Sequence, residues 1–275
     1  MRKRADPIPL RVLAVGAVLF FSLCDVANAT TIVVARSANE IVIGADSKVT
    51  DTYGHELNNQ VCKIQQVGNL FLAFEGLLRD KATGFSVPEI AVKALQLKPD
   101  GSAAERVNIL TGFLTSELFV ELQHVRNNSA DEFHTKLEGQ TFLRVVVAGF
   151  EGNRPVVFVR QFRTTFIARG IGVTVIPDDC LDGCQGEVVT RFLGETEAIE
   201  GLPEDTPGFW KEGLADGVRR LIEMEIEARS EYVGPPIDLL RITAQGAKWI
   251  QKKPGCPDLK LVRKRINSPS RTKRR

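Results

Sequence analysis

Thr30 has the residue type and the sequence position from which a reactive centre can be built. The preceding segment Ala27-Asn28-Ala29 has small residues three and one positions before Thr30, as at the end of a secretory leader. Cleavage there would make Thr30 the new N-terminus. A free N-terminal threonine carries a hydroxyl nucleophile and its own general base, the α-amine. The sequence therefore predicts that leader removal creates a catalytic nucleophile.

The leader has the features of an export signal. An Arg-Lys-Arg triplet after the first methionine precedes an apolar run over 12–23, shorter than the roughly 20 residues needed to span a bilayer. We interpret residues 1–29 as a signal peptide, which predicts a periplasmic or secreted protein. An uncleaved anchor, or a lipoprotein signal using Cys24, would instead leave Thr30 internal and inert; the bulky Leu23 argues against the lipoprotein signal.

Length and charge favour one folded domain followed by a basic tail. The chain has 275 residues, of which 43% are hydrophobic, enough for one sizeable core over 30–251. The formal net charge of +2 hides a net charge of about −9 in 30–251 and about +9 in 252–275. We expect 252–275 to be a solvated, disordered tail; contact with anionic lipid or an acidic partner is the alternative. Specific nucleic-acid binding is not expected.

The cysteines and histidines indicate disulfide chemistry more than a metal site. An even number of cysteines follows the leader, namely Cys62, Cys180, Cys184 and Cys256. Cys180 and Cys184 enclose only three residues, so a local disulfide is expected, and a metal site would need two further ligands. The histidines are scattered, at His55, His124 and His134. No metal and no cofactor are therefore predicted.

Residue periodicity predicts separate blocks of strands and helices. Predicted strands cover 30–35, 40–47, 61–67, 70–75, 142–150, 155–161, 163–168, 237–242 and 247–251. One predicted helix begins near Pro88, and two others cover about 103–125 and 209–230. A loop-rich insert occupies about 174–207. Segregated blocks with antiparallel hairpins indicate an α+β fold, with two sheets packed face to face and covered by helices.

The start of the predicted mature chain resembles a known family. TTIVVARSANEIVIGADSKVT is similar to the start of a mature catalytic β-subunit of the 20S proteasome and its bacterial relatives, the threonine branch of the N-terminal nucleophile hydrolases. That family has an aspartate sixteen residues after the threonine, as Asp46 is here. Its lysine corresponds to Lys63, one position later than usual, and its oxyanion-hole glycine to Gly76. Weaker similarity continues through VVVAGFEGNRPVVFV and IDLLRITAQG.

The resemblance implies a four-layer αββα sandwich that hydrolyses amide or peptide bonds. Lys63 would supply positive charge beside the threonine oxygen, and Asp46 would hold Lys63 in place. The Gly76 N–H would bind the tetrahedral oxyanion, a contribution of about 3 kcal/mol in another enzyme. Because the relatives assemble into rings, a homo-oligomer is expected.

The same register implies where a peptide or acyl-amide substrate would bind. Thr50 would offer backbone hydrogen bonds to an extended peptide. Val49 and Phe74 would line the pocket beside Thr30. Such a pocket is apolar and narrow, and it would suit a small apolar side chain or a non-peptide acyl amide.

Three positions depart from the family pattern. Ile171 and Val233 stand where the family has serines, and Ser230 stands where it has an aspartate. Ser230 or Glu231 would replace the missing support in part. The alternative function is therefore a noncatalytic assembly or binding module with a depleted active site.

Overall fold

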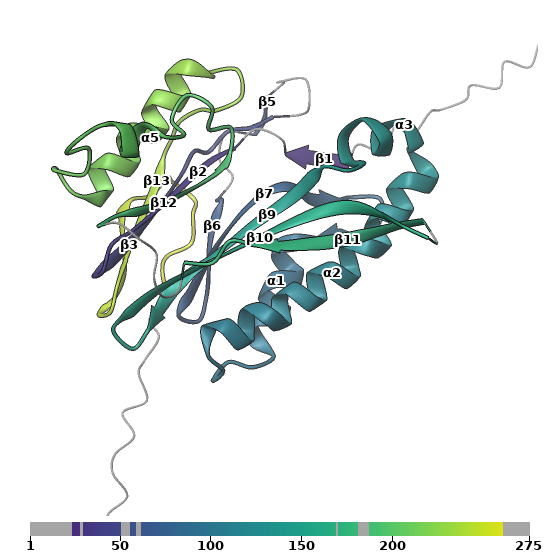
Figure 1. Ribbon diagram of the computed structural model, residues 1–275, viewed down its shortest axis with the longest axis horizontal. Coiled ribbons are helices and arrows are strands. Elements are labelled where there is room, and N and C mark those ends of the chain that lie inside the picture. The colour runs from purple at the N-terminus through teal and green to yellow at the C-terminus, as the bar shows by residue number, and fades with distance from the viewer. Residues whose placement is uncertain are drawn as a thin grey trace, which may run out of the picture.

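The computed structural model describes residues 24–27, 30–50, 56–58, 62–168, 170–180 and 187–260. In this part of the chain, the strands form two large antiparallel sheets and one small two-stranded sheet. Helices lie against the large sheets (Figure 1). The predicted α+β class is confirmed.

Sheet A has more strands than sheet B in the described part of the chain. Its strands follow the order β1-β7-β9-β10-β11, and β6 and β8 also pair with β7. They are β1 (Cys24–Ala27), β6 (Ile64–Val67), β7 (Leu70–Asp80), β8 (Phe85–Ser86), β9 (Thr141–Glu151), β10 (Arg154–Ile167) and β11 (Gly170–Pro177). Strand β1 runs antiparallel to β7 with Ala27 opposite Gly76. Sheet A therefore includes residues that precede the predicted cleavage position.

Sheet B begins with the strand that follows Thr30. Its order is β12-β2-β3-β13-β14. The strands are β2 (Thr31–Arg36), β3 (Glu40–Ala45), β12 (Val189–Gly194), β13 (Asp238–Thr243) and β14 (Gly246–Gln251), and the small sheet pairs β4 (Val49–Thr50) with β5 (Glu56–Asn58). At the open end of the β2–β3 hairpin, the Asp46 N–H donates to the Thr31 carbonyl at 3.2 Å. The hairpin thus brings Thr31 and Asp46 together.

Helices cover the outer faces of the two large sheets. Helices α1 (Val87–Gln96) and α2 (Ala103–Asn128) pack against sheet A, and α5 (Leu214–Ala228) packs against sheet B (Figure 1). Shorter segments are α3 (Ala130–Glu132), the π-helical turn η1 (Phe133–Leu137) and α4 (Leu202–Asp205). Helix α2 starts at a capping box in which Ser102 and Glu105 each accept a hydrogen bond from the other's backbone N–H.

Three apolar clusters hold these elements together. The first lies between sheet A and helices α1 and α2, the second between the two sheets, and the third between sheet B and α5. In β2, Ile32 and Val34 belong to the cluster between the sheets, whereas Val33 and Ala35 belong to the cluster against α5. Successive strand side chains point to opposite faces, so a strand covered on both faces must be apolar throughout.

The second half of the chain differs from the predicted element boundaries. Predicted strands 155–161 and 163–168 form one continuous strand, β10. The predicted loop-rich insert over 174–207 also contains the end of β11, strand β12 and helix α4. Strand β12 pairs along β2, with Gly194 opposite Thr31. Its short run mixes polar and apolar residues, so periodicity alone does not reveal it.

The predicted tail begins too early in the sequence. Residues 252–260 fold against the domain: Lys253 is buried, and Cys256 forms a disulfide with Cys62. The basic composition of this segment does not predict its burial, because composition does not show that a charged side chain has a buried partner. The rest of the predicted tail, 261–275, lies outside the described residues.

The same glycine substitution should have opposite effects at two positions. A Cβ on Gly44 of β3 would lie 2.4 Å from Val218 Cγ1 and 2.6 Å from Ile222 Cδ1, both on α5. Gly44→Ala should therefore lower the free energy of unfolding by about 1–3 kcal/mol. Gly112 in α2 has no atom within 4 Å of its Cβ position, so Gly112→Ala should raise it by about 0.5–1 kcal/mol. Urea unfolding measures both; equal changes would contradict the packing of α5 on β3.

Candidate active site

Asp46 is the centre of the candidate site. Its carboxylate follows the last residue of β3 and is fully buried. Oδ1 accepts hydrogen bonds from the Thr31 N–H at 2.9 Å and from Lys63 Nζ at 2.6 Å. Oδ2 accepts from the backbone N–H groups of Lys48 at 3.0 Å and Gly234 at 3.2 Å. Four hydrogen-bond donors therefore satisfy the buried carboxylate.

Lys63 is the buried cation of the site. Its side chain is 4% exposed, and its ammonium also donates to the Lys48 carbonyl at 2.6 Å. Burial lowers the pKa of Lys63, the nearby Asp46 carboxylate opposes this effect, and the Lys253 ammonium lowers the pKa further. Because Asp46 Oδ1 accepts from both Lys63 and the Thr31 N–H, the ammonium lies beside the peptide that joins Thr30 to Thr31.

Thr30 is held in place through its own carbonyl and through the side chain of Thr31. Thr30 is buried, and its carbonyl accepts from the Glu195 N–H at 2.8 Å. The Thr31 hydroxyl donates to the Glu195 carbonyl at 2.6 Å. Gly194 has a φ of +85°, and a Cβ there would lie 1.6 Å from the Thr30 carbonyl oxygen. The end of β12 therefore fixes Thr30, and only a glycine allows this approach.

Gly76 occupies a backbone position that requires glycine. Its φ is +104°, and a Cβ there would lie 2.2 Å from the Phe142 carbonyl oxygen. Gly76 lies in β7 opposite Ala27 of β1. The glycine predicted to bind an oxyanion thus faces the segment that leads to Thr30.

The predicted substrate-binding residues fall on two elements. Val49 and Thr50 form β4, where they pair with Asn58 and Glu56 of β5. Phe74 is buried in the cluster between sheet A and the helices. The assignment of these residues to a binding site stays a prediction.

Ser230 and Glu231, predicted to support the lysine, make other contacts. The Ser230 carbonyl accepts from Lys48 Nζ at 2.9 Å. Glu231 lies 3.6 Å from Arg229 Nε in an ion pair. In the part of the chain that the structure describes, these contacts lead to Lys48 and Arg229 and not to Lys63.

Three residues that the sequence analysis did not single out complete the surroundings of Asp46. Lys253 Nζ lies 2.9 Å from Asp238 Oδ2 and donates to the Ser47 hydroxyl at 2.6 Å. Ser47 directly follows Asp46 in the chain. The sequence signal that could have indicated Lys253 was the even number of cysteines. The Cys62–Cys256 disulfide, with a Cα–Cα distance of 5.6 Å, holds the segment of Lys253 at this site.

The other cysteines do not indicate a metal site. Cys180 is buried and disulfide-bonded, and its predicted partner Cys184 lies outside the described residues. Among the described residues, no group of three or more histidine, cysteine, aspartate or glutamate side chains could hold a metal ion.

A separate cavity of about 370 Å³ lies between α1 and α2. It shares no residue with the Asp46 site; Ser86, Phe113 and Glu121 are among its lining residues. Glu121 is buried and accepts from the Thr83 hydroxyl at 2.8 Å. Burial, together with a hydrogen bond to the Asp80 carboxyl, raises the pKa of Glu121 to about 7.

No protein-family model matches this chain, and no curated protein sequence is significantly similar to it. Among the described residues, no helix combines the length and the apolar character needed to cross a bilayer.

Removing the charge of Asp46 should destabilise the fold strongly. Asp46→Asn leaves the Lys63 ammonium buried without its carboxylate, so the free energy of unfolding should fall by about 3–5 kcal/mol. As a control, Asp178→Asn removes a more exposed carboxylate that pairs with Arg191 at 2.8 Å and should cost less than about 1 kcal/mol. Chemical unfolding near neutral pH measures both. Similar losses would show that Asp46 does not compensate a buried cation.

Glu121 should make stability fall as the pH rises from about 4.5 to 7. The ordinary pKa of 4.5 applies to the unfolded chain and a pKa of about 7 to the folded protein, so the folded state binds more protons in this window. Glu121→Gln should therefore raise the free energy of unfolding relative to wild type, by an amount that grows with pH over this window. The exposed Glu117→Gln control should run parallel to wild type. Parallel curves for both variants would contradict the raised pKa.

Proposed function

We propose that this protein is a threonine-type N-terminal nucleophile hydrolase related to the proteasome β-subunits. The observation that carries the proposal is the buried Lys63–Asp46 ion pair beside the peptide that joins Thr30 to Thr31. This pair supports a reaction centre because a buried cation next to a hydroxyl favours loss of the hydroxyl proton.

The arrangement of layers supports the same proposal. Apolar clusters join α1 and α2 to sheet A, sheet A to sheet B, and sheet B to α5. We propose that these layers constitute the four-layer αββα sandwich of the N-terminal nucleophile hydrolases. Fold alone does not define an activity, so the argument for catalysis depends on the site.

The proposed reaction uses the hydroxyl and the α-amine of Thr30, the positive charge of Lys63 beside that hydroxyl, and the backbone N–H of Gly76. Leader removal frees the Thr30 α-amine, which accepts the proton of the Thr30 hydroxyl, directly or through water, as the oxygen attacks the substrate carbonyl carbon. The oxyanion of the tetrahedral intermediate accepts a hydrogen bond from the Gly76 N–H. The C–N bond breaks, the proton passes to the leaving amine, and an ester remains on Thr30. Water then hydrolyses the ester and regenerates the hydroxyl.

The position of β1 supports an extended acyl chain as the substrate. Residues 24–27 pair with β7 from Gly76 to Asp80 and precede Thr30 by a few positions. An extended peptide that adds to the same strand edge would direct a carbonyl toward Thr30 once the leader has gone. We therefore propose a peptide or acyl-amide substrate. The predicted export signal adds a periplasmic or secreted location, and the family resemblance adds a homo-oligomer.

A second candidate is a noncatalytic assembly or binding module. The observation that favours it is the apolar character of two positions where the family has serines: Ile171 and Val233 are both buried. The site would then lack hydroxyls that hold the amine in the relatives. The two candidates differ in whether Thr30 reacts.

Intact mass spectrometry of the exported protein, with and without a β-lactone, should separate the candidates. We expect a chain that begins at Thr30 and gains one adduct. Thr30→Val removes the hydroxyl at constant shape and should abolish the adduct. Thr31→Val is the matched control: it loses only the hydrogen bond to Glu195, worth about 1 kcal/mol, and should retain the adduct.

Two results would contradict the hydrolase. A chain that begins at a residue other than Thr30 would have no α-amine at the proposed centre. A chain that begins at Thr30, but gains no adduct from either a β-lactone or an epoxyketone, would support the binding module.

A further inference from the structure

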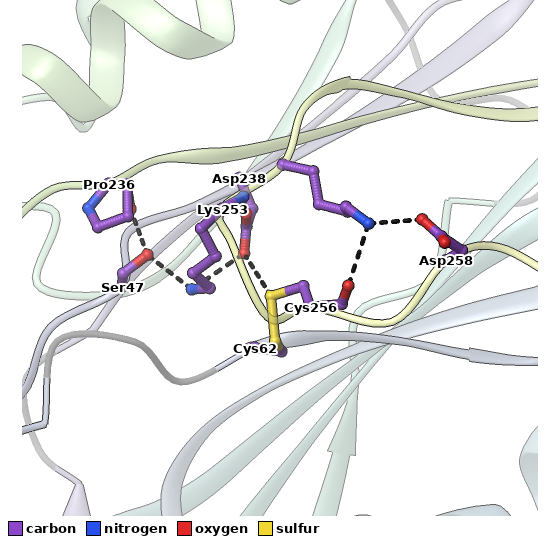
Figure 2. Close-up of a disulfide and its surroundings, with 8 residues drawn as sticks. Ser47, Cys62, Pro236, Asp238, Lys253, Cys256 and Asp258 are labelled. Carbon is purple, nitrogen blue, oxygen red and sulfur yellow. Dashed lines mark hydrogen bonds and ion pairs between the residues drawn. A yellow bond between two sulfur atoms is a disulfide. The ribbon is translucent and has the colours of Figure 1, made fainter.

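A second buried lysine lies next to the proposed reaction centre. Lys253 follows β14, and the side chains of Lys253 and Asp238 are both 0% exposed. Figure 2 shows the Lys253 ammonium between Asp238 and Ser47, and the Cys256 sulfur of the Cys62–Cys256 disulfide beside Asp238. The backbone N–H of Lys253 also donates to Asp238 Oδ1 at 2.8 Å. The pair is therefore fixed from both the side chain and the backbone.

Such a pair needs an explanation other than stability. Taking two charges out of water costs several kcal/mol per ion, and an apolar pair of similar size often stabilises a protein as well or better. The Lys253–Asp238 pair also lies close to the Asp46–Lys63 pair, on which its charges can act. Asp238 opens β13 opposite Ala45, the residue before Asp46.

Two connections link Lys253 to the Asp46–Lys63 pair. Lys253 donates to the hydroxyl of Ser47, and that hydroxyl in turn donates to the Pro236 carbonyl. This chain of hydrogen bonds fixes the backbone directly after Asp46. The other connection is covalent, because the disulfide joins the residue before Lys63 to Cys256.

We propose that Lys253 is a positioning residue of the Thr30 centre: with Asp238, it sets the electrostatic environment of Lys63 and fixes Ser47, and the Cys62–Cys256 disulfide holds it there. The catalytic consequence rests on the proposed function, whereas the electrostatic effect on Lys63 does not. The C-terminal segment 252–256 is then part of the site and not a tail.

The charged groups that act on Lys63 define the expected signs. Asp46 and Asp238 raise its pKa, and Lys253 lowers it, in addition to the larger effect of burial. Lys63 also donates a hydrogen bond to the uncharged carbonyl of Lys48. Removing Lys253 should therefore raise the pKa of Lys63, and removing the charge of Asp238 should lower it.

The test is a lysine-detected NMR titration of Lys63 in the exported protein with its C-terminal segment intact. Lys253→Met should move the Lys63 midpoint to higher pH, and Asp238→Asn should move it to lower pH. Opposite directions distinguish electrostatic positioning from a general loosening, which would shift both variants alike. The control Lys248→Met removes an exposed lysine of β14 and should leave the midpoint unchanged.

A double variant keeps the test decisive if either single variant does not fold. Lys253→Met with Asp238→Asn removes both charges and leaves no unpaired ion. The Lys63 midpoint should still rise, by a smaller amount, because Lys253 acts on Lys63 more strongly than Asp238 does. An unchanged midpoint in every folded variant, or shifts in the same direction for both single variants, would overturn the proposal.

A second readout connects the titration to the reaction. In the double variant, acylation of Thr30 by a β-lactone should slow by up to about 100-fold, and the pH profile of its rate should shift together with the Lys63 midpoint. Replacing Cys62 and Cys256 together by serine should shift that profile in the direction seen for Lys253→Met. If wild-type Thr30 is never acylated, the proposed function fails, while the NMR titration still decides the position of Lys253.

Discussion

The structure depends on the requirement that the buried carboxylate of Asp46 be fully hydrogen-bonded. Its two oxygens accept from Thr31, Lys63, Lys48 and Gly234. These donors come from the start of β2, from the segment before β6, from the chain after β3 and from the segment before β13. An ionised carboxylate in the core is tolerated only with such partners. One acceptor thus joins the segment after β3 to three other parts of the chain.

Close backbone contacts contribute to the site in addition to the charged groups. At Gly194 and Gly76, a side chain would overlap carbonyl oxygens of neighbouring strands. The first contact fixes Thr30 against β12, and the second lets β7 approach β9 while its other edge remains open to β1. These glycines allow backbone groups to come closer than side chains would permit. The position of Thr30 is therefore set largely by the main chain.

Local patterns predicted the parts of the molecule that local sequence determines. The β2–β3 hairpin, the apolar face of α2 and the α+β class follow from periodicity and turn residues. The family resemblance of the segment that begins at Thr30 suggested Asp46 and Lys63, which form an ion pair here. Strand β12 and the Lys253–Asp238 pair depend on contacts between residues far apart in the sequence. A lysine in a basic segment resembles a surface residue, because composition does not show which carboxylate it meets. The disulfide was missed for the same reason, since pairings cannot be deduced from cysteine spacing alone.

The order of Lys63 and Lys253 in the chain has a consequence for biosynthesis. The ribosome makes Thr30, Asp46 and Lys63 early, and it adds Lys253 and Cys256 only after both large sheets have been translated. A nascent or truncated chain that ends before these residues lacks the second cation and the covalent link to Cys62. The surroundings of the Asp46–Lys63 pair are therefore completed only after both large sheets have been made, and formation of the disulfide requires oxidising conditions.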